Sequence, residues 1–264
     1  MDFLLECVGF PPDRDERELV ELVRRVGEPA AWRGRDGEHL SLRLAEGLEL
    51  RFDREEEDGA WSLLPFFREN HRLRVAVESI GFVADSPFDA ILVGWAAPPT
   101  PGAGAGGARP GEYLLTTWLT DARRLPRDIA RGHVLAVSTA GFALDVQRVG
   151  PNLELADAAD LERPRGARIE PLRAADAPEG CAEVSARVRE LRHVRNAITG
   201  VPIDVLEVDA PGRPLHLFVS PWQLARDGLP APRPGWRVEG TFLFLGRIAG
   251  GLPGPSRRAR RAFG

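Results

Sequence analysis

Two tryptophans and two arginines lie close together near the end of the chain, in a stretch suited to binding. Trp222, Arg233, Trp236 and Arg237 fall within a segment that glycine and proline interrupt repeatedly. Aromatic rings stack on nucleobases, and arginine adds stacking and bidentate contacts. The same residue types dominate protein–protein interfaces. We predict a ligand-binding surface at these four residues; the alternative is that Trp222 and Trp236 fill a barrel core.

The histidines do not form a metal-binding pattern. No two of His39, His71, His133, His193 and His216 have the spacing of a metal motif, and neither a CxxC nor an HExxH sequence occurs. Zinc motifs depend on such spacing because ligands from one turn or helix converge on the ion. We predict no metal site and no cofactor.

Candidates for nucleophilic or acid–base catalysis are weak. The chain has no GxSxG sequence, and Cys7 and Cys181 lack the basic neighbours that lower a thiol pKa. Cys7 is expected to be a small buried hydrophobe. His71 has the most polar context of the histidines, and Asp145 and Asp204 are single acids in strand-like runs. We predict no catalytic residue, and a hydrolase with a composite site remains an alternative because triads assemble from distant segments.

The basic residues exclude several enzyme classes. The sequence contains no lysine, so all 35 of its Lys and Arg positions are arginine. Pyridoxal enzymes, Walker-type nucleotidases and kinases require a lysine for the Schiff base or the phosphates. The sequence GAGAGG resembles a dinucleotide-binding loop, but prolines flank it and a strand-like run follows where a helix is needed.

The charge distribution bears on the partner. The net charge is −4, and the last segment holds four arginines (Arg257, Arg258, Arg260 and Arg261) that leave −8 for the rest of the chain. An acidic body is poorly suited to a phosphate backbone. We therefore expect another protein as the partner, with single-stranded nucleic acid as the alternative. The chain shows no signal peptide and no membrane-spanning run, which predicts a bacterial cytoplasmic protein without a membrane partner.

The N-terminal region, residues 1–70, is predicted to be α+β. Asp13 and Glu16 form a capping box, apolar residues from Leu19 to Val26 recur at helical spacing, and Gly27 ends the helix. Residues 38–52 alternate leucine and phenylalanine with polar residues on both sides of an AEG turn. This pattern predicts a β-hairpin whose apolar face packs on the helix.

The remainder is predicted to contain a duplicated β unit. Trp118 precedes a Leu-Pro pair by the same spacing as Trp222 does, Gly132 and Gly235 follow, and residues 77–83 match 188–194 at one offset. The fold class is mainly β (α+β): the N-terminal helix and hairpin are followed by two related OB-like barrel units. The predicted divisions are a first unit at 71–150, a linker at 151–180, a second unit at 181–250 and a basic tail at 251–264.

The stretch from residue 61 to 248 resembles a family of uncharacterised bacterial proteins. The matching features are Asn196, Thr199–Gly200, Pro234–Gly235 and the strand-like run GTFLFLGRI at 240–248, with LPFFRENHRLRVAV upstream. The chain departs from the family pattern by lacking a tryptophan in that run. The resemblance implies OB-like β units and no known activity. We expect a non-catalytic binding or protein-interaction protein.

Overall fold

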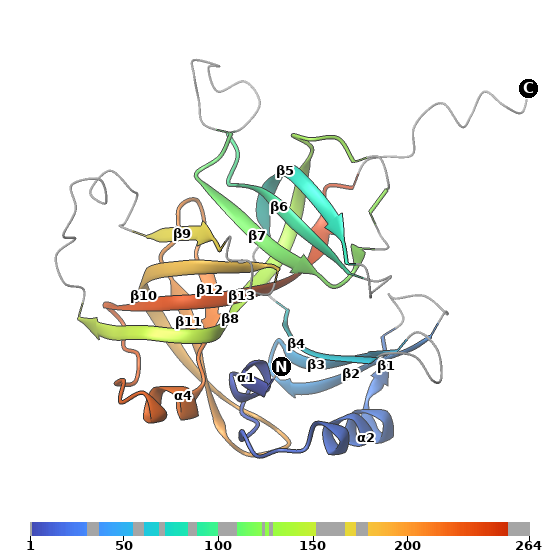
Figure 1. The fold of residues 1–264 in the computed structure, drawn as a ribbon, viewed down its shortest axis with the longest axis vertical. Coiled ribbons are helices and arrows are strands. Elements are labelled where there is room, and N and C mark those ends of the chain that lie inside the picture. The colour runs from blue at the N-terminus through green and yellow to red at the C-terminus, as the bar shows by residue number, and fades with distance from the viewer. Residues whose placement is uncertain are drawn as a thin grey trace, which may run out of the picture.

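The computed structural model describes residues 2–30, 37–54, 61–68, 72–83, 89–99, 110–122, 125–126, 129–151, 167–172 and 179–252. Most of these residues lie in two β-sheets, so the prediction of a mainly β protein is confirmed. His71, the Pro/Gly-rich segment 100–109 and most of the predicted basic tail fall outside the described residues. In Figure 1 the N-terminal sheet lies below two groups of strands, with the long strands β8 and β13 between those groups.

The N-terminal unit contains helices α1 (Asp2–Glu6) and α2 (Glu16–Val26) and the strands β1 (Glu28–Pro29), β2 (Glu38–Ala45), β3 (Leu48–Arg54) and β4 (Trp61–Phe67). The predicted helix is confirmed as α2, and Gly27 ends it. The predicted cap was wrong: Asp15 caps the helix, accepting the Arg17 N–H at 2.8 Å. Asp15 satisfies a first-turn N–H because it directly precedes the helix.

The predicted hairpin is confirmed as β2 and β3, which pair antiparallel around Gly47. Gly47 has φ +74°, a left-handed conformation that glycine adopts without strain. Both faces of β3 are covered. Leu48, Leu50 and Phe52 are buried on one face, while Arg51 and Asp53 are buried on the other. The sheet therefore lies between α2 and another part of the molecule.

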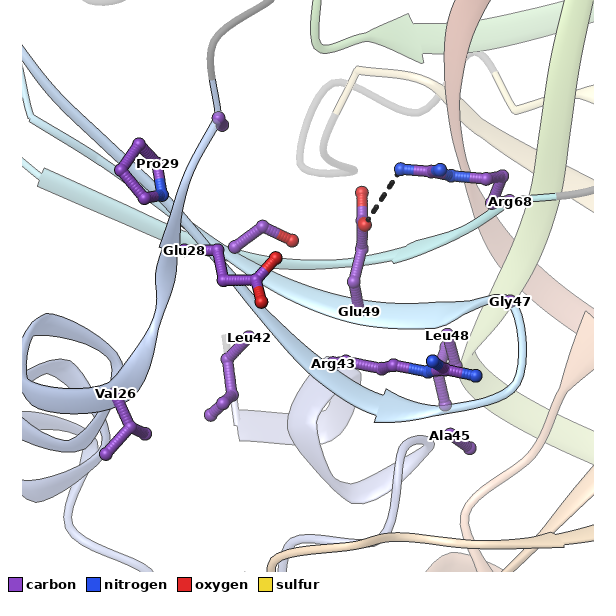
Figure 2. Close-up of a pocket in the computed structure, with 12 residues that line it drawn as sticks. Val26, Glu28, Pro29, Leu42, Arg43, Ala45, Gly47, Leu48, Glu49 and Arg68 are labelled. Carbon is purple, nitrogen blue, oxygen red and sulfur yellow. Dashed lines mark hydrogen bonds and ion pairs between the residues drawn. The ribbon is translucent and has the colours of Figure 1, made fainter.

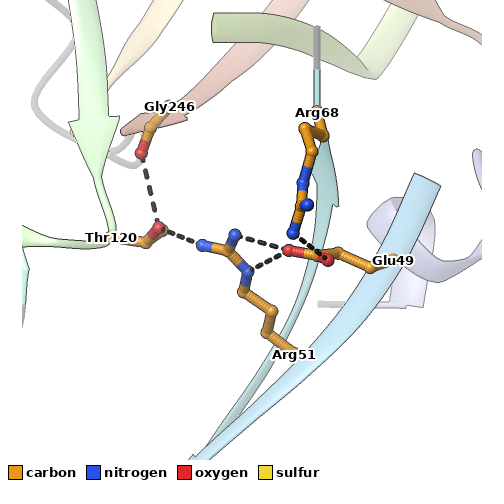
Figure 3. Close-up of polar contacts among 5 residues, drawn as sticks. All are labelled: Glu49, Arg51, Arg68, Thr120 and Gly246. Carbon is orange, nitrogen blue, oxygen red and sulfur yellow. Dashed lines mark hydrogen bonds and ion pairs between the residues drawn. The ribbon is translucent and has the colours of Figure 1, made fainter. Parts of the chain in front are cut away.

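Arg51 connects this sheet to the strands above it (Figure 3). It is 1% exposed and donates to one carboxylate oxygen of Glu49 at 2.7 and 2.5 Å and to Thr120 Oγ1 at 2.9 Å. Its guanidinium carbon lies 3.8 Å from the centroid of the Phe66 ring. Thr120 in turn donates to the Gly246 carbonyl at 3.4 Å. A buried guanidinium requires this density of partners because its hydration has been lost.

Replacement of Arg51 by alanine should destabilise the protein by about 3–5 kcal/mol, because the buried contacts of its guanidinium would be lost and the Glu49 carboxylate, 13% exposed, would lose its main partner. Arg68 provides a matched control, since it also reaches Glu49, at 3.5 Å, but is 58% exposed. Arg68→Ala should cost less than about 1 kcal/mol. Urea unfolding of both variants gives the comparison, and equal losses would show that Arg51 is not a buried anchor.

The remaining strands form two closed rings. They are β5 (Leu73–Phe82), β6 (Ala90–Ala96), β7 (Tyr113–Leu119), β8 (Val134–Pro151), β9 (Arg168–Pro171), β10 (Cys181–Arg195), β11 (Pro202–Val208), β12 (Leu215–Phe218) and β13 (Trp236–Gly250), with helix α4 (Pro221–Arg226) before β13. The first ring pairs β5–β6–β7–β13–β8 and returns to β5. The second pairs β10–β11–β12–β8–β13 and returns to β10. Strands β8 and β13 therefore belong to both rings.

One part of the predicted repeat was wrong. Trp118 lies in strand β7, whereas Trp222 lies in helix α4, so the two tryptophans do not occupy equivalent places. Trp118 pairs with Leu245 of β13, and Phe218 pairs with Phe142 of β8. Phe142 and Leu245 have the same sequence separation as Gly132 and Gly235, so they occupy corresponding places on β8 and β13. Phe218, which pairs with Phe142, is therefore the counterpart of Trp118, which pairs with Leu245. The shared spacing of the tryptophans to a Leu-Pro pair did not reflect shared structure.

The predicted linker also contains structure. Strand β9 lies within residues 151–180 and pairs antiparallel with β10 from Ala182 to Ser185. Ala167 and Ile169 are buried beside β7 and β10. The end of this region therefore belongs to the second group of strands.

Replacement of Gly141 even by alanine should destabilise the protein. A Cβ there would lie 2.7 Å from Leu217 Cδ2 and 3.2 Å from Phe244 Cε1, and both residues are fully buried. Gly141→Ala should therefore cost about 1–3 kcal/mol of unfolding free energy through overpacking. Gly150, also on β8, has no neighbour within 4 Å of such a Cβ. Gly150→Ala should be close to neutral, and thermal unfolding that ranks the two variants the other way would contradict this.

Candidate binding surface

Two of the four predicted site residues lie together. The Arg233 guanidinium carbon is 5.1 Å from the centroid of the Trp236 ring, and the Trp236 N–H donates to the Arg233 carbonyl at 3.0 Å. Trp236 begins β13 and is half-buried against the core, while Arg233 is exposed. The cation–π contact at the surface of the second ring holds the arginine over the ring face.

The other two predicted residues have different surroundings. Arg237 is 5% exposed and donates to Ser185 Oγ at 2.9 Å, and Ser185 donates to Glu239 Oε1 at 2.9 Å. Its guanidinium is thus engaged within the sheet. Trp222 is half-buried on α4, whose N-cap Ser220 accepts the Gln223 N–H. The structure therefore removes Arg237 from the accessible part of this predicted surface, whereas Arg233, Trp236 and Trp222 keep exposed area.

A second surface, which the sequence analysis did not identify, lies on the outward side of β6 and β7. Three cross-strand pairs occupy it: Ile91 with Trp118, Val93 with Thr116, and Trp95 with Leu114. We call these six residues the β6–β7 strip. Val93, Trp95, Leu114 and Trp118 are half-buried, and no member of the strip carries a charge. Neighbouring apolar residues on an outward sheet face are typical of an interaction surface.

The sequence contained a signal for this strip. The inward residues of the same strands, such as Leu92 and Leu115, are also apolar and buried. A strand that covers a core on one face and meets water on the other normally alternates apolar and polar residues. The runs AILVGWA and YLLTTWL do not alternate, which indicates that both faces meet apolar surroundings.

The corresponding face of the second ring is covered by the chain itself. Phe67, at the end of β4, lies with its ring centroid 5.1 Å from those of both His216 and Phe218. Phe218 stacks on Phe142 at 4.9 Å. His216 and Phe218 lie on the face of β12 that corresponds to the Thr116 and Trp118 face of β7. On the second ring, Phe67 of the N-terminal unit therefore covers the face that corresponds to the strip on the first ring.

Asn196 and Thr199 help to hold that unit in place. Asn196 donates through Nδ2 to the Val8 carbonyl at 2.7 Å, and Thr199 donates to the Gly9 carbonyl at 2.7 Å. Asn196 also accepts the backbone N–H groups of Ile198 and Thr199. Asn196 is fully buried, so its full set of hydrogen bonds supports a structural role.

A cavity of about 600 Å³ lies at the edge of the N-terminal sheet (Figure 2). Its floor includes Val26 and Leu42, and its charged lining consists of Glu28, Glu49 and the arginines 43 and 68. The two acids balance the two arginines, and Glu49 is already bound by Arg68 and by the buried Arg51. The lining therefore favours no single ligand charge.

Three of the four described histidines, His39, His193 and His216, lie beside acids, and the fourth, His133, contacts the Gly251 carbonyl. His39 Nδ1 lies 2.7 Å from Asp53 Oδ1 in a buried pair, and His193 Nδ1 lies 2.7 Å from Asp204 Oδ1 on the exposed β10–β11 hairpin. Such a carboxylate can orient an imidazole. Among the described residues, no three His, Cys, Asp or Glu side chains gather as metal ligands would. Asp145 is exposed.

Neither cysteine is suited to act as a nucleophile. Cys7 is buried, as predicted, and donates to the Ala143 carbonyl at 3.5 Å. Burial raises the pKa of the Cys7 thiol to about 12 and that of Cys181 to about 11. The reactive form is the thiolate, so both groups are almost entirely unreactive at neutral pH.

These thiols should make stability depend on pH in alkali. An unfolded thiol loses its proton near pH 9, whereas the folded thiols keep theirs, so stability is complete below pH 9 and falls as pH rises toward 11. Each group contributes up to about 1.4 kcal/mol per pH unit in that window. Cys7→Ala/Cys181→Ala should therefore lose less stability than the parent protein between pH 8.5 and roughly 10.5. Urea unfolding measures this, and parallel curves would contradict it.

The chain was compared with known proteins. It matches no protein-family model, no curated protein and no solved structure. The arrangement of its own residues therefore carries the functional argument. None of the helices in the part of the chain that the structure describes is long and apolar enough to cross a membrane.

Proposed function

We propose that this protein is a non-catalytic interaction protein of the cytoplasm, built on two OB-like barrels, and that it binds another protein through the β6–β7 strip. The closure of each ring by five strands supports this proposal, since an OB barrel has five strands and binds ligands on the face of its second and third strands. In the first ring these are β6 and β7.

The observation that carries the proposal is the composition of the strip. Val93, Trp95 and Leu114 are half-buried on this face of adjacent strands, while Trp118 packs partly against the core with its indole nitrogen buried. Tryptophan buries a large apolar area at an interface and is enriched among the residues that contribute most to affinity. Exposed Phe82, 57% accessible at the end of neighbouring β5, adds apolar area to the same ring.

Single-stranded nucleic acid is the second candidate ligand because Trp95 and Trp118 both lie on the strip. Bases stack on aromatic side chains of OB-type faces. Affinity for nucleic acid also depends on arginine or lysine contacts with phosphates. The six strip residues provide no cation, and the chain carries a net charge of −4. The protein partner is therefore favoured.

The test compares strip variants with a surface control. Trp95→Ser and Leu114→Ser should each reduce affinity for a protein captured by the immobilised parent at least about tenfold, because they remove apolar contact area. Val26→Ser is the control, since Val26 is 51% exposed on α2, away from the strip. It should leave that affinity unchanged. Unfolding curves of all three variants establish that the fold is retained.

Two outcomes would contradict the proposal. One is a partner retained equally by the parent and both strip variants. The other is binding of single-stranded DNA or RNA, by fluorescence anisotropy, at concentrations on the order of tens of micromolar or below, with an affinity that falls steeply as salt rises. The second result would assign the strip to nucleic acid.

A further inference from the structure

The two rings are built from each other's strands. The first half of β8, from Val134 to Val137, pairs with β5, and a later part, from Ala140 to Phe142, pairs in parallel with β12 of the second ring. Strand β13 starts in the second ring and crosses to the first. Its first half pairs with β10, and Leu245 and Gly246 pair in parallel with β7 of the first ring. Each long strand thus begins in its own ring and ends in the other.

The same irregularities occur at corresponding places in both rings. The β5–β6 register shifts between Val77 and Ser79, and the β10–β11 register shifts between Val188 and Glu190. A bulge bends a strand so that it can follow a closed ring. Opposite each bulge a glycine donates its N–H at 2.7 Å: Gly132 to the Val77 carbonyl, and Gly235 to the Val188 carbonyl.

These glycines also share a backbone conformation. Gly132 has φ +83° and Gly235 has φ +85°. Both lie just before the strand that crosses into the other ring, β8 or β13. The pairing order, the bulges and the glycine conformations together relate residues 72–151 to residues 179–252 as two equivalent halves.

The pairing of β8 with β13 places an approximate twofold axis between them. Gly141 pairs directly with Phe244, and the separation of these two residues is the one that relates Gly132 to Gly235. Gly141 and Phe244 are thus each other's counterparts across the axis. Any association of two identical halves would place two glycines or two phenylalanines face to face there.

The residues at this axis are complementary in size. A Cβ on Gly141 would already lie 3.2 Å from the Phe244 ring, so two phenylalanines cannot replace this pair without displacement. Two glycines would leave the space of a phenyl ring empty, which is costly in a packed core. The axis therefore accommodates the first half, which contributes Gly141, together with the second half, which contributes Phe244, but not two copies of either half.

We infer that residues 72–151 and 179–252 are two equivalent halves of one chain that exchange strands, as the two subunits of a heterodimer would. The interaction surface of each half is its crossing strand, and the partner that fits it is the other half rather than a second copy of itself. Neither ring closes without the strand that the other half supplies. Cutting the chain between the halves should therefore leave a stable two-chain protein.

The experiment introduces a site for a sequence-specific protease into residues 152–166 of the full chain and cuts it there. After cutting, the fragments should elute together at the size of the intact protein. In urea, loss of the β-sheet circular dichroism and separation of the fragments should occur in one transition, whose midpoint rises with protein concentration. Fragments that separate while either retains its sheet signal would overturn the inference.

Two sets of variants separate ring exchange from the contacts of the N-terminal unit. Asn196→Ala/Thr199→Ala weakens the hold on that unit, and its cut fragments should still co-elute. Gly141→Ala should lower the concentration of urea at which the cut fragments separate, whereas Gly150→Ala should not. Folded fragments that separate in the Asn196→Ala/Thr199→Ala protein would show that the N-terminal unit, and not strand exchange, joins the halves.

Discussion

The antiparallel pairing of β8 with β13 is the interaction on which the rest of the structure depends. It runs from Ala136 beside Gly250 to Pro151 beside Trp236, and it forms a wall of both rings. Backbone hydrogen bonds at a sheet edge must be satisfied, and ring closure satisfies them without an exposed edge. In this protein closure of one ring supplies the strand that closes the other. The stability of the two rings is therefore shared.

The N-terminal unit makes two otherwise similar rings different. Phe67 and the segment around Val8 and Gly9 cover the second ring, and Arg51 joins the sheet to the end of β7 in the first. The two attachments use different physical means. Packing of Phe67 and hydrogen bonds to the Val8 and Gly9 carbonyls attach the unit to the second ring. The buried guanidinium of Arg51 attaches it to the first. The unit lies across both rings, which leaves the strip on β6 and β7 as the contrasting apolar face.

Local patterns in the sequence were enough to predict helix α2 and the β2–β3 hairpin. Apolar spacing and glycine positions determine such elements over a few residues. The match of residues 77–83 with 188–194 was also visible as one constant offset, and that of Gly132 with Gly235 as a glycine following each Leu-Pro pair. The predicted match of Trp118 with Trp222 was wrong, because the spacing from each tryptophan to the following Leu-Pro pair does not depend on which strands pair. Pairing, which decides equivalence, depends on partners distant in the chain.

The candidate surface was harder to predict than the fold. Arg237 and Trp236 are adjacent in sequence, yet one is buried with Ser185 and the other carries Arg233 on its ring. Alternation along β13 decides this, and the sequence around a glycine-opened turn did not indicate which residue faces inward. Trp95 and Leu114 were missed because apolar residues on both faces of a strand look like core. Only the three-dimensional structure distinguishes an outward apolar face from an inward one.

The exchanged strands also set the order in which the chain can mature during synthesis. The first ring needs Leu245 and Gly246 beside β7, and these residues follow their partners on β7 by more than 100 positions. Strands β5 to β8 leave the ribosome long before their closing partner is made. Pairings between residues so far apart in sequence form slowly, and open strand edges expose a growing chain to misassociation. The nascent first half therefore waits, with an unclosed ring, until β13 of the second half has been translated.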